Sequence, residues 1–189
     1  MYNETHDYDK IFFTSDLHFF HANILKWASK TRKGSDVFDM NNQIIEEWNK
    51  KVPSDGLVYL LGDVSWKSSR ETNEILYQLN GRICLIAGNH DESNLRNQSF
   101  RDRFEWVRDY SEVKINNRKI IMMHYPIESW KDKDHDSWHL HGHLHGNTSH
   151  ECQEMKNRLD IGIDNRYSGD MQVWSLGEIK IHMENQRGI

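Results

Sequence analysis

The chain has 189 residues, with 24 Lys or Arg against 29 Asp or Glu, which gives a formal net charge of -5 with the histidines neutral. This length fits one ordinary domain, so we expect a single domain over residues 1–189. Seven Trp, seven Tyr and seven Phe argue against a disordered chain, and the acidic balance without a basic run argues against a long nucleic-acid duplex as partner.

The first predicted strands are short apolar runs, and each of them ends in a polar cluster. The runs cover residues 10–15, 57–61, 83–87 and 119–123. Because they are nearly continuous in apolar residues, they predict strands that are buried on both faces. Cys84 lies in the third run, where we expect a buried thiol.

Helices are predicted between these strands. Apolar residues recur at three- and four-residue spacing from Met40 to Val52, with Asp39 as the expected N-cap. A second helix is expected from Glu71 to Leu79, before Gly81. Alternating strands and helices predict a layered α/β domain.

The second half of the chain has a more antiparallel pattern. Residues 113–115 and 120–122 flank Asn116-Asn117-Arg118, which predicts a hairpin. The alternation over residues 178–183 predicts a final strand with one face in water.

The beginning of the chain lacks a signal-peptide pattern, and no apolar stretch is long enough to span a membrane. Two cysteines are too few for a disulfide framework, and the role of Cys152 is left open. We therefore expect a cytoplasmic protein with no membrane partner; the oligomeric state is left open.

Five polar segments that can carry chemistry follow one another along the chain. They are Asp16-Leu17-His18, Gly62-Asp63, Gly88-Asn89-His90-Asp91, His124, and His141-Gly142-His143-Leu144-His145-Gly146. Singly, each is compatible with ordinary turn chemistry or a structural histidine. Four of them stand at the ends of predicted strands, where α/β sheets bind ligands, and their order therefore favours one common site.

This ordered set resembles the signature of the calcineurin-like metallophosphoesterase superfamily, and the resemblance extends from Asp16 to His145. Residues 16–24 resemble the opening of a small bacterial and phage-type subgroup, in which the place of Phe20 is often Gly. The resemblance implies an α/β fold of the four-layer α-β-β-α type, with two mixed sheets flanked by helices.

The resemblance also implies a dinuclear metal centre. One metal ion would be held by Asp16, His18, Asp63 and His145, and the other by Asp63, Asn89, His124 and His143, with Asp63 bridging the two. His90 would stand outside the ligand shell and protonate the leaving oxygen or stabilise the phosphoryl group. Two divalent ions are expected, Mn first and Fe, Zn, Co or Ni as alternatives, because the donors are mixed carboxylate, amide and imidazole groups.

The predicted activity is hydrolysis of a small phosphorylated substrate, with a nucleotide as one candidate, by a hydroxide that bridges the two metals. A phosphodiesterase and a nucleotide phosphatase are both compatible with such a centre. For either activity, the predicted catalytic residues are His90 and Asp63. Two alternatives stay open: a protein-binding scaffold of the same fold with a non-catalytic metal site, and a metal-storage or sensing protein. The complete motifs argue against the first, and a histidine outside the ligand set argues against the second.

Further residues near the motifs have two readings each. His21, Asp91 and Tyr125 are candidate substrate contacts, although Asp91 is also a candidate helix cap. His139, His141, Asp160 and Asp164 either support the site or are ordinary strand and turn residues. Four aromatic residues either stack on a nucleobase or belong to the core: Trp27, Trp66, Tyr125 and Trp130. The remaining histidines are expected on the surface: His6, His135, His150 and His182.

Overall fold

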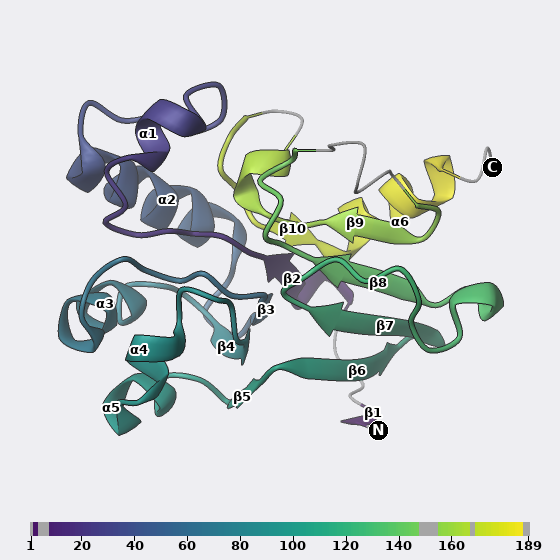
Figure 1. The fold of residues 1–189 in the computed structure, drawn as a ribbon. Helices are drawn as coiled ribbons and strands as arrows, with labels where there is room; N and C mark the ends of the chain where they lie inside the picture. Colours follow the sequence, from purple (N-terminus) through teal and green to yellow (C-terminus); the bar gives the residue numbers. More distant parts are fainter. Residues whose placement is uncertain (1, 4–7, 148–154, 167–168, 187–189) are drawn as a thin grey trace.

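The computed structural model describes residues 2–3, 8–147, 155–166 and 169–186, and its framework is a pair of five-stranded mixed sheets (Figure 1). The first sheet has the order β10-β2-β3-β4-β5, with β10 antiparallel and the other pairs parallel. Its strands are β2 (Ile11–Thr14), β3 (Leu57–Leu60), β4 (Arg82–Ile86), β5 (Trp106–Arg108) and β10 (Trp174–Ser175).

The second sheet has the order β1-β6-β7-β8-β9, in which only the β6-β7 pair is antiparallel. Its strands are β1 (Tyr2–Asn3), β6 (Tyr110–Ile115), β7 (Arg118–Met123), β8 (Trp138–His141) and β9 (Arg158–Asp160). The predicted hairpin is confirmed: β6 and β7 are joined by Asn116 and Asn117, both in the left-handed region that such tight turns require.

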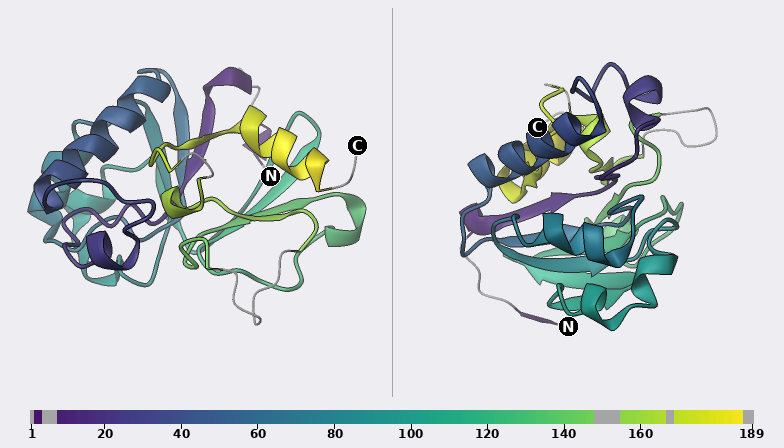
Figure 2. Two further views of the ribbon diagram at one scale, coloured as in Figure 1. Left: turned by 90° about the horizontal axis from the view of Figure 1, so that it is seen from above. Right: turned by 90° about the vertical axis from the view of Figure 1, so that its left-hand side faces the viewer.

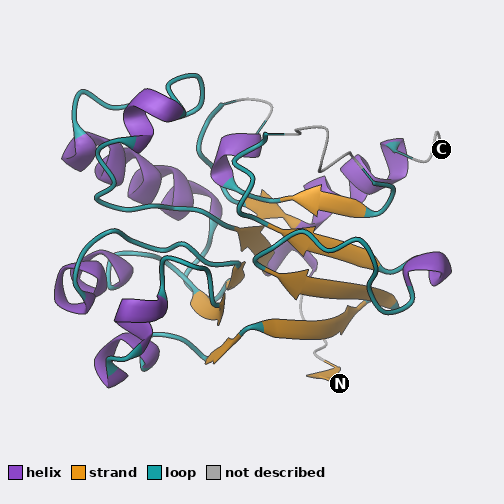
Figure 3. Ribbon diagram, in the orientation of Figure 1, coloured by secondary structure: helices purple, strands orange, loops and turns teal. Residues whose placement is uncertain are grey.

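The helices lie on both sides of this framework (Figures 2 and 3). Those at one end of the molecule are α1 (Ile24–Trp27), α2 (Val37–Lys51), α3 (Ser69–Leu76), α4 (Glu92–Leu95) and α5 (Gln98–Arg101), and α6 (Leu176–Asn185) lies at the other end. Short 3-10 helices are η1 (Tyr8–Lys10), η2 (Lys133–His135) and η3 (Ile163–Asn165). The predicted α/β fold with two mixed sheets and flanking helices is confirmed.

Two cores result from the alternation of side chains along the first sheet. Phe12 and Val58 point to the core beneath α2 and α3, which Ile44 and Trp48 also fill. Ile11, Phe13 and Tyr59 point to the core between the two sheets. Strands β2 and β3 are buried along their whole length, as their continuous apolar sequence predicted.

The predicted final strand is wrong, because residues 176–185 form the helix α6. Ser175 and Glu178 form a capping box: the Ser175 hydroxyl accepts from Glu178 N at 3.2 Å, and Glu178 Oε2 accepts from Ser175 N at 2.7 Å. Ile179 and Met183 are buried four residues apart on one helix face, whereas Ile181 is exposed. The alternating apolar residues therefore mimic a strand within a helix.

Both predicted helix starts are also wrong by a few residues. Helix α2 begins at Val37 after Asp36, whose side chain accepts from two backbone N–H groups, while Asp39 accepts from Ser35 N instead. Helix α3 begins at Ser69 after the Ser68 cap and ends at Leu76, ahead of the predicted end. In each case an earlier Asp or Ser provides a better cap geometry.

No helix in the described part of the chain is long and apolar enough to cross a membrane. Cys84 is buried, as expected. His6, His150 and Cys152 lie outside the described residues. The single domain over residues 1–189 and the cytoplasmic location stay predictions.

Candidate metal centre

The loops that follow β2, β3, β4, β7 and β8 bring the five polar segments to one edge of the two sheets (Figure 1). Two clusters of metal-ligating side chains form there. One contains Asp16, His18 and His145, and the other contains Asp63, His124 and His143; within each, the ligand atoms lie within 4.8 Å of one another. These are six of the seven residues predicted as ligands.

Asp63 lies between the two clusters. Its Oδ2 atom is 3.6 Å from His18 Nε2 and also 3.6 Å from His124 Nε2. One carboxylate oxygen thus faces a ring nitrogen of each cluster. This is the position that a ligand shared by two metal ions requires.

Asn89 supplies the seventh predicted ligand atom. Its Oδ1 lies 3.0 Å from His124 Nε2 and 3.1 Å from His143 Nδ1. The amide oxygen therefore converges with the second cluster. The structure brings all seven residues together, and their roles as metal ligands stay predictions.

The first cluster contains a buried atom without a partner. Asp16 is fully buried, and its Oδ1 atom has no hydrogen-bond partner. It lies 3.9 Å from both His18 Nε2 and His145 Nε2, which are 3.3 Å apart. Burial, followed by the nearby His145, lowers the pKa of His18 to about 2, so its ring is neutral. The neutral His18 imidazole and the unpartnered Asp16 Oδ1 fit a divalent cation.

Two of the histidines are oriented by a hydrogen bond from the other ring nitrogen. His124 Nδ1 lies 2.7 Å from the Leu61 carbonyl oxygen, and His145 Nδ1 lies 2.7 Å from Asp164 Oδ2. With Nδ1 donating, each Nε2 lone pair points into its cluster. Such partners fix the tautomer and ring orientation that metal ligation needs.

Asp164 and Arg32 form a buried pair behind His145. Asp164 accepts from Arg32 Nε at 2.7 Å, from Arg32 Nη2 at 2.8 Å and from Thr31 Oγ1 at 2.7 Å. Arg32 also donates to the carbonyl oxygens of Asp16 and Leu17. From the sequence, Asp164 was either a residue that supports the site or an ordinary turn residue. Its contact with His145 favours the supporting role. Arg32 was missed because nothing near it in sequence marks it as functional.

The backbone at this edge is unusual. Five of the converging residues have positive φ although none is glycine: Asp16 (57°), His18 (49°), Asp63 (55°), His143 (73°) and His145 (51°). Such conformations are uncommon for non-glycine residues and gather at functional sites. Phe20 also has a positive φ of 62°, so the loop keeps the conformation that glycine would adopt there.

The loops hold each other in these conformations. Asp16 N donates to the Gly62 carbonyl and His18 N to the Asp63 carbonyl, both at 3.0 Å. Gly142 lies so close to the first loop that a Cβ atom would meet Ser15 Oγ at 1.9 Å and Asp16 Oδ2 at 2.3 Å. The glycine of the Gly-His-Leu-His segment is thus required by packing between the loops.

The structure contradicts the predicted contact between Asp91 and substrate. It is fully buried and accepts from Asp63 N at 2.9 Å, Val64 N at 2.9 Å and Gly88 N at 2.8 Å. Its side chain makes no cap bond to α4. A buried carboxylate whose oxygens are taken up by three backbone groups cannot reach substrate, so the prediction is wrong. Asp91 instead ties the loops after β3 and β4 together.

His90 stands at the mouth of the site. Its side chain is 40% exposed, and Nε2 lies 3.9 Å from Asp63 Oδ2. Its backbone N–H donates to Asp63 Oδ1 at 2.9 Å. His90 faces a cavity of about 1220 Å³ that is also lined by His18, His143 and His145. Its predicted catalytic role stays a prediction.

The other aromatic candidates separate into exposed and buried residues. His21 stacks on Trp66 with ring centroids 4.1 Å apart, and Trp66 and Trp27 are exposed in the same cavity. Tyr125 packs edge-on against His143, with ring centroids 4.7 Å apart. Trp130 is buried and donates to Ser137, which places it in the core. Substrate contacts by His21 and Tyr125 stay predictions.

His139 and His141 are buried on β8 and belong to neither ligand cluster. His139 Nε2 accepts from Ile127 N at 3.2 Å, and burial lowers the pKa of its ring to about 3. Asp160 accepts from Gly146 N at 3.0 Å and Gly162 N at 2.8 Å. These residues position backbone around the site. His135 is exposed and His182 is half-buried.

Comparison with known proteins agrees with this geometry. The family model described as Calcineurin-like phosphoesterase matches residues 9–174. Uncharacterized protein MJ1445 of Methanocaldococcus jannaschii is 36% identical over 140 residues, which cover 73% of this chain and 70% of that protein. Gene 66 protein of Mycobacterium phage D29 is 27% identical over 182 residues, covering 82% and 87%. The crystal structure of the protein of unknown function AQ665 from Aquifex aeolicus has a TM-score of 0.70 at 23% identity, covering 91% of this chain and 98% of that one, and shares the fold.

Proposed function

We propose a function from the premise that this chain belongs to the calcineurin-like phosphoesterase family: it hydrolyses a small phosphate ester at a dinuclear metal centre. The family match confirms the predicted enzyme class, a metal-dependent hydrolase of phosphoric ester bonds. The observation that carries the dinuclear centre is the position of Asp63 Oδ2, 3.6 Å from a ring nitrogen of each cluster.

The donor sets fit two divalent ions. Asp16, His18, Asp63 and His145 would hold one ion, and Asp63, Asn89, His124 and His143 the other. Mn is the metal we expect first, with Fe, Zn, Co or Ni as alternatives, because the donors combine oxygen and imidazole nitrogen without thiolate. When bound, a metal pair supplies an activated nucleophile at neutral pH and neutralises charge on the phosphoryl oxygens.

His90 is the side chain outside the ligand sets to which we assign a role in the reaction. His90, at the mouth of the cavity, would hold a proton on Nε2 for the leaving oxygen or stabilise the phosphoryl group. The bond from its backbone N–H to Asp63 Oδ1 fixes His90 relative to the shared ligand. The cavity is open at its mouth, which suits a phosphodiester or a nucleotide. The hydrolysis assay below distinguishes a preference for diesters from a preference for monoesters.

The test is hydrolysis of paired chromogenic mono- and diesters by metal-stripped protein, with Mn, Ni, Zn, Co or Mg added back. We expect metal-dependent turnover, and the faster ester identifies the activity. Asp63→Asn should abolish turnover and weaken both ions, since it removes the shared charged ligand. Asp55→Asn, in an exposed ion pair with Lys10, is the matched control. Two bound ions without turnover on any ester would favour the scaffold alternative.

A further inference from the structure

Two tryptophans are exposed in the cavity that contains the ligand clusters. Trp27 is 74% exposed and Trp66 is 47% exposed, and both line this cavity with His18 and His145. Four other tryptophans are buried: Trp48, Trp130, Trp138 and Trp174. An indole left in water beside a site, when most others of the chain are buried, indicates a binding surface rather than core packing.

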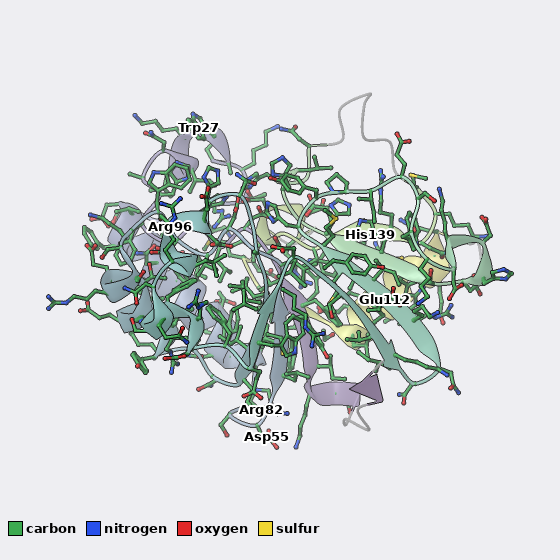
Figure 4. The ribbon with its side chains drawn as sticks, turned by 60° about the horizontal axis from the view of Figure 1, so that its bottom comes forward. Trp27, Asp55, Arg82, Arg96, Glu112 and His139 are labelled. Carbon is green, nitrogen blue, oxygen red and sulfur yellow. The ribbon has the colours of Figure 1, made fainter. Side chains whose placement is uncertain are left out.

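The rings form a continuous row from a predicted metal ligand to the outer edge of the molecule. Trp66 lies 6.0 Å from His18, ring centroid to centroid, and stacks on His21 at 4.1 Å with an interplanar angle of 6°. His21 in turn contacts Trp27 at 5.4 Å and 81°. His21 therefore packs against Trp66, and the row ends at Trp27, the last residue of α1, which lies at the periphery of the molecule (Figure 4).

The charge around this row favours an anion. Among the described residues that line the cavity, the one carboxylate is Asp164, which is buried and held by Arg32. Lys30 lines the cavity with Trp27, and Lys26, Lys30 and Lys33 are all exposed on the segment that carries Trp27. An exposed aromatic ring that shares a cavity with a lysine is an arrangement that binds a base next to its phosphate.

We propose that Trp27 is a stacking platform for a nucleobase, with Trp66 and His21 as the adjoining wall, so that the ester hydrolysed here carries a nucleoside. The proposal rests on the proposed function, because the ligand clusters must hold the phosphoryl group for Trp27 to meet the base. A flat aromatic ring in a cavity with Lys30 matches a nucleobase with a phosphate better than it matches a sugar phosphate, which has no aromatic face.

The first test is binding to the Mn-loaded protein by calorimetry, with non-hydrolysable phosphonate analogues of AMP and of ribose 5-phosphate. The AMP analogue should bind about 5- to 100-fold more tightly, and Trp27→Ala should remove most of this ratio while Trp27→Phe retains most of it. Tyr77→Ala, an exposed aromatic residue outside the cavity, is the matched control and should keep the ratio. Equal binding of both analogues by the unaltered protein would overturn the proposal.

The second test separates this proposal from the proposed function. A protein that hydrolyses simple chromogenic esters but binds the two analogues equally has the proposed activity without a base subsite. A protein that prefers the AMP analogue but hydrolyses no ester has the subsite without the activity. A single-stranded tetranucleotide with a 5′-phosphate distinguishes the sources of the base: tighter, salt-sensitive binding supports a nucleic-acid end as the substrate, and binding no tighter than AMP supports a free nucleotide.

Discussion

Replacing Asp164 by Asn tests whether the buried pair behind His145 supports the metal centre. The side chains of Arg32 and Asp164 are 0% and 1% exposed, and Asp164 accepts from Arg32, Thr31 and His145 at 2.7 to 2.8 Å. Asn has one acceptor oxygen instead of two and must turn an NH₂ group toward one of these donors. The Arg32 charge is then left without a buried counter-ion.

Removal of one partner from a buried ion pair costs about 3–5 kcal/mol, and we expect a loss of this size in the free energy of unfolding of the metal-free protein. Loss of the carboxylate that orients His145 should also weaken the first metal by about 10- to 100-fold. Urea denaturation measures the first effect, and metal titration by calorimetry measures the second.

Asp55→Asn is the matched control for this substitution, because its pair with Lys10 is exposed and contributes little to stability. The second cluster provides an internal control: its ligand His124 is oriented by the Leu61 carbonyl and not by Asp164, so the second metal should change less. An Asp164→Asn protein with unaltered affinity for both metals would refute the inference that Asp164 positions His145.

Three further outcomes are expected. His90→Ala should keep both metals and lose turnover by about 10²- to 10⁴-fold, measured by metal content and kinetics; an emptied metal site would contradict its place outside the ligand shell. Burial opposes ionisation of Glu178, but hydrogen bonds from Lys51 and Arg166 outweigh it and lower its pKa from 4.5 to about 2. Because the folded pKa is depressed, the stabilisation, about 1 kcal/mol after solvent screening, is present above pH 4.5 and is lost as the pH falls toward 2. Glu178→Gln should reduce the change of the unfolding free energy with pH in that range. An unchanged slope of unfolding free energy against pH would contradict this. Gly142→Ala should lower the unfolding free energy by about 1–3 kcal/mol and weaken the first metal, since its Cβ has no room; unaltered thermal unfolding would show that the loops can separate.

The strands that carry the site were predictable because two-sided burial leaves a direct mark on sequence. Strands β2, β3, β4 and β7 each follow from a continuous apolar run. The polar residues after β2, β3 and β4 converge because these parallel strands end at a common edge of one sheet, and His124 after β7 joins them through the packing of the second sheet. The order of the polar segments could therefore predict one common site. The seven candidate ligands within it were named from the resemblance to the calcineurin-like family.

Other features depend on contacts between distant segments, which no local pattern encodes. Arg32 and Asp164 are far apart in sequence and meet only in the fold. Asp91 follows a metal-binding motif and resembles a pocket residue, yet the backbone groups of the neighbouring loop bury it. Helix α6 was misread because its apolar residues alternate, and the capping box at Ser175 is the local signal that would have corrected the prediction.

The positive φ angles connect the loop network to the metal centre. A left-handed conformation at a non-glycine residue costs of order 1 kcal/mol or more, and five of the converging residues adopt it. Such a cost is sustained only where the surroundings enforce the conformation. Here the backbone bonds from Asp16 and His18 to the next loop, the three bonds to Asp91 and the contact at Gly142 provide that constraint. The side chains are thus directed toward two common points by bonds that need no bound ion, so the centre is arranged for binding by the fold itself.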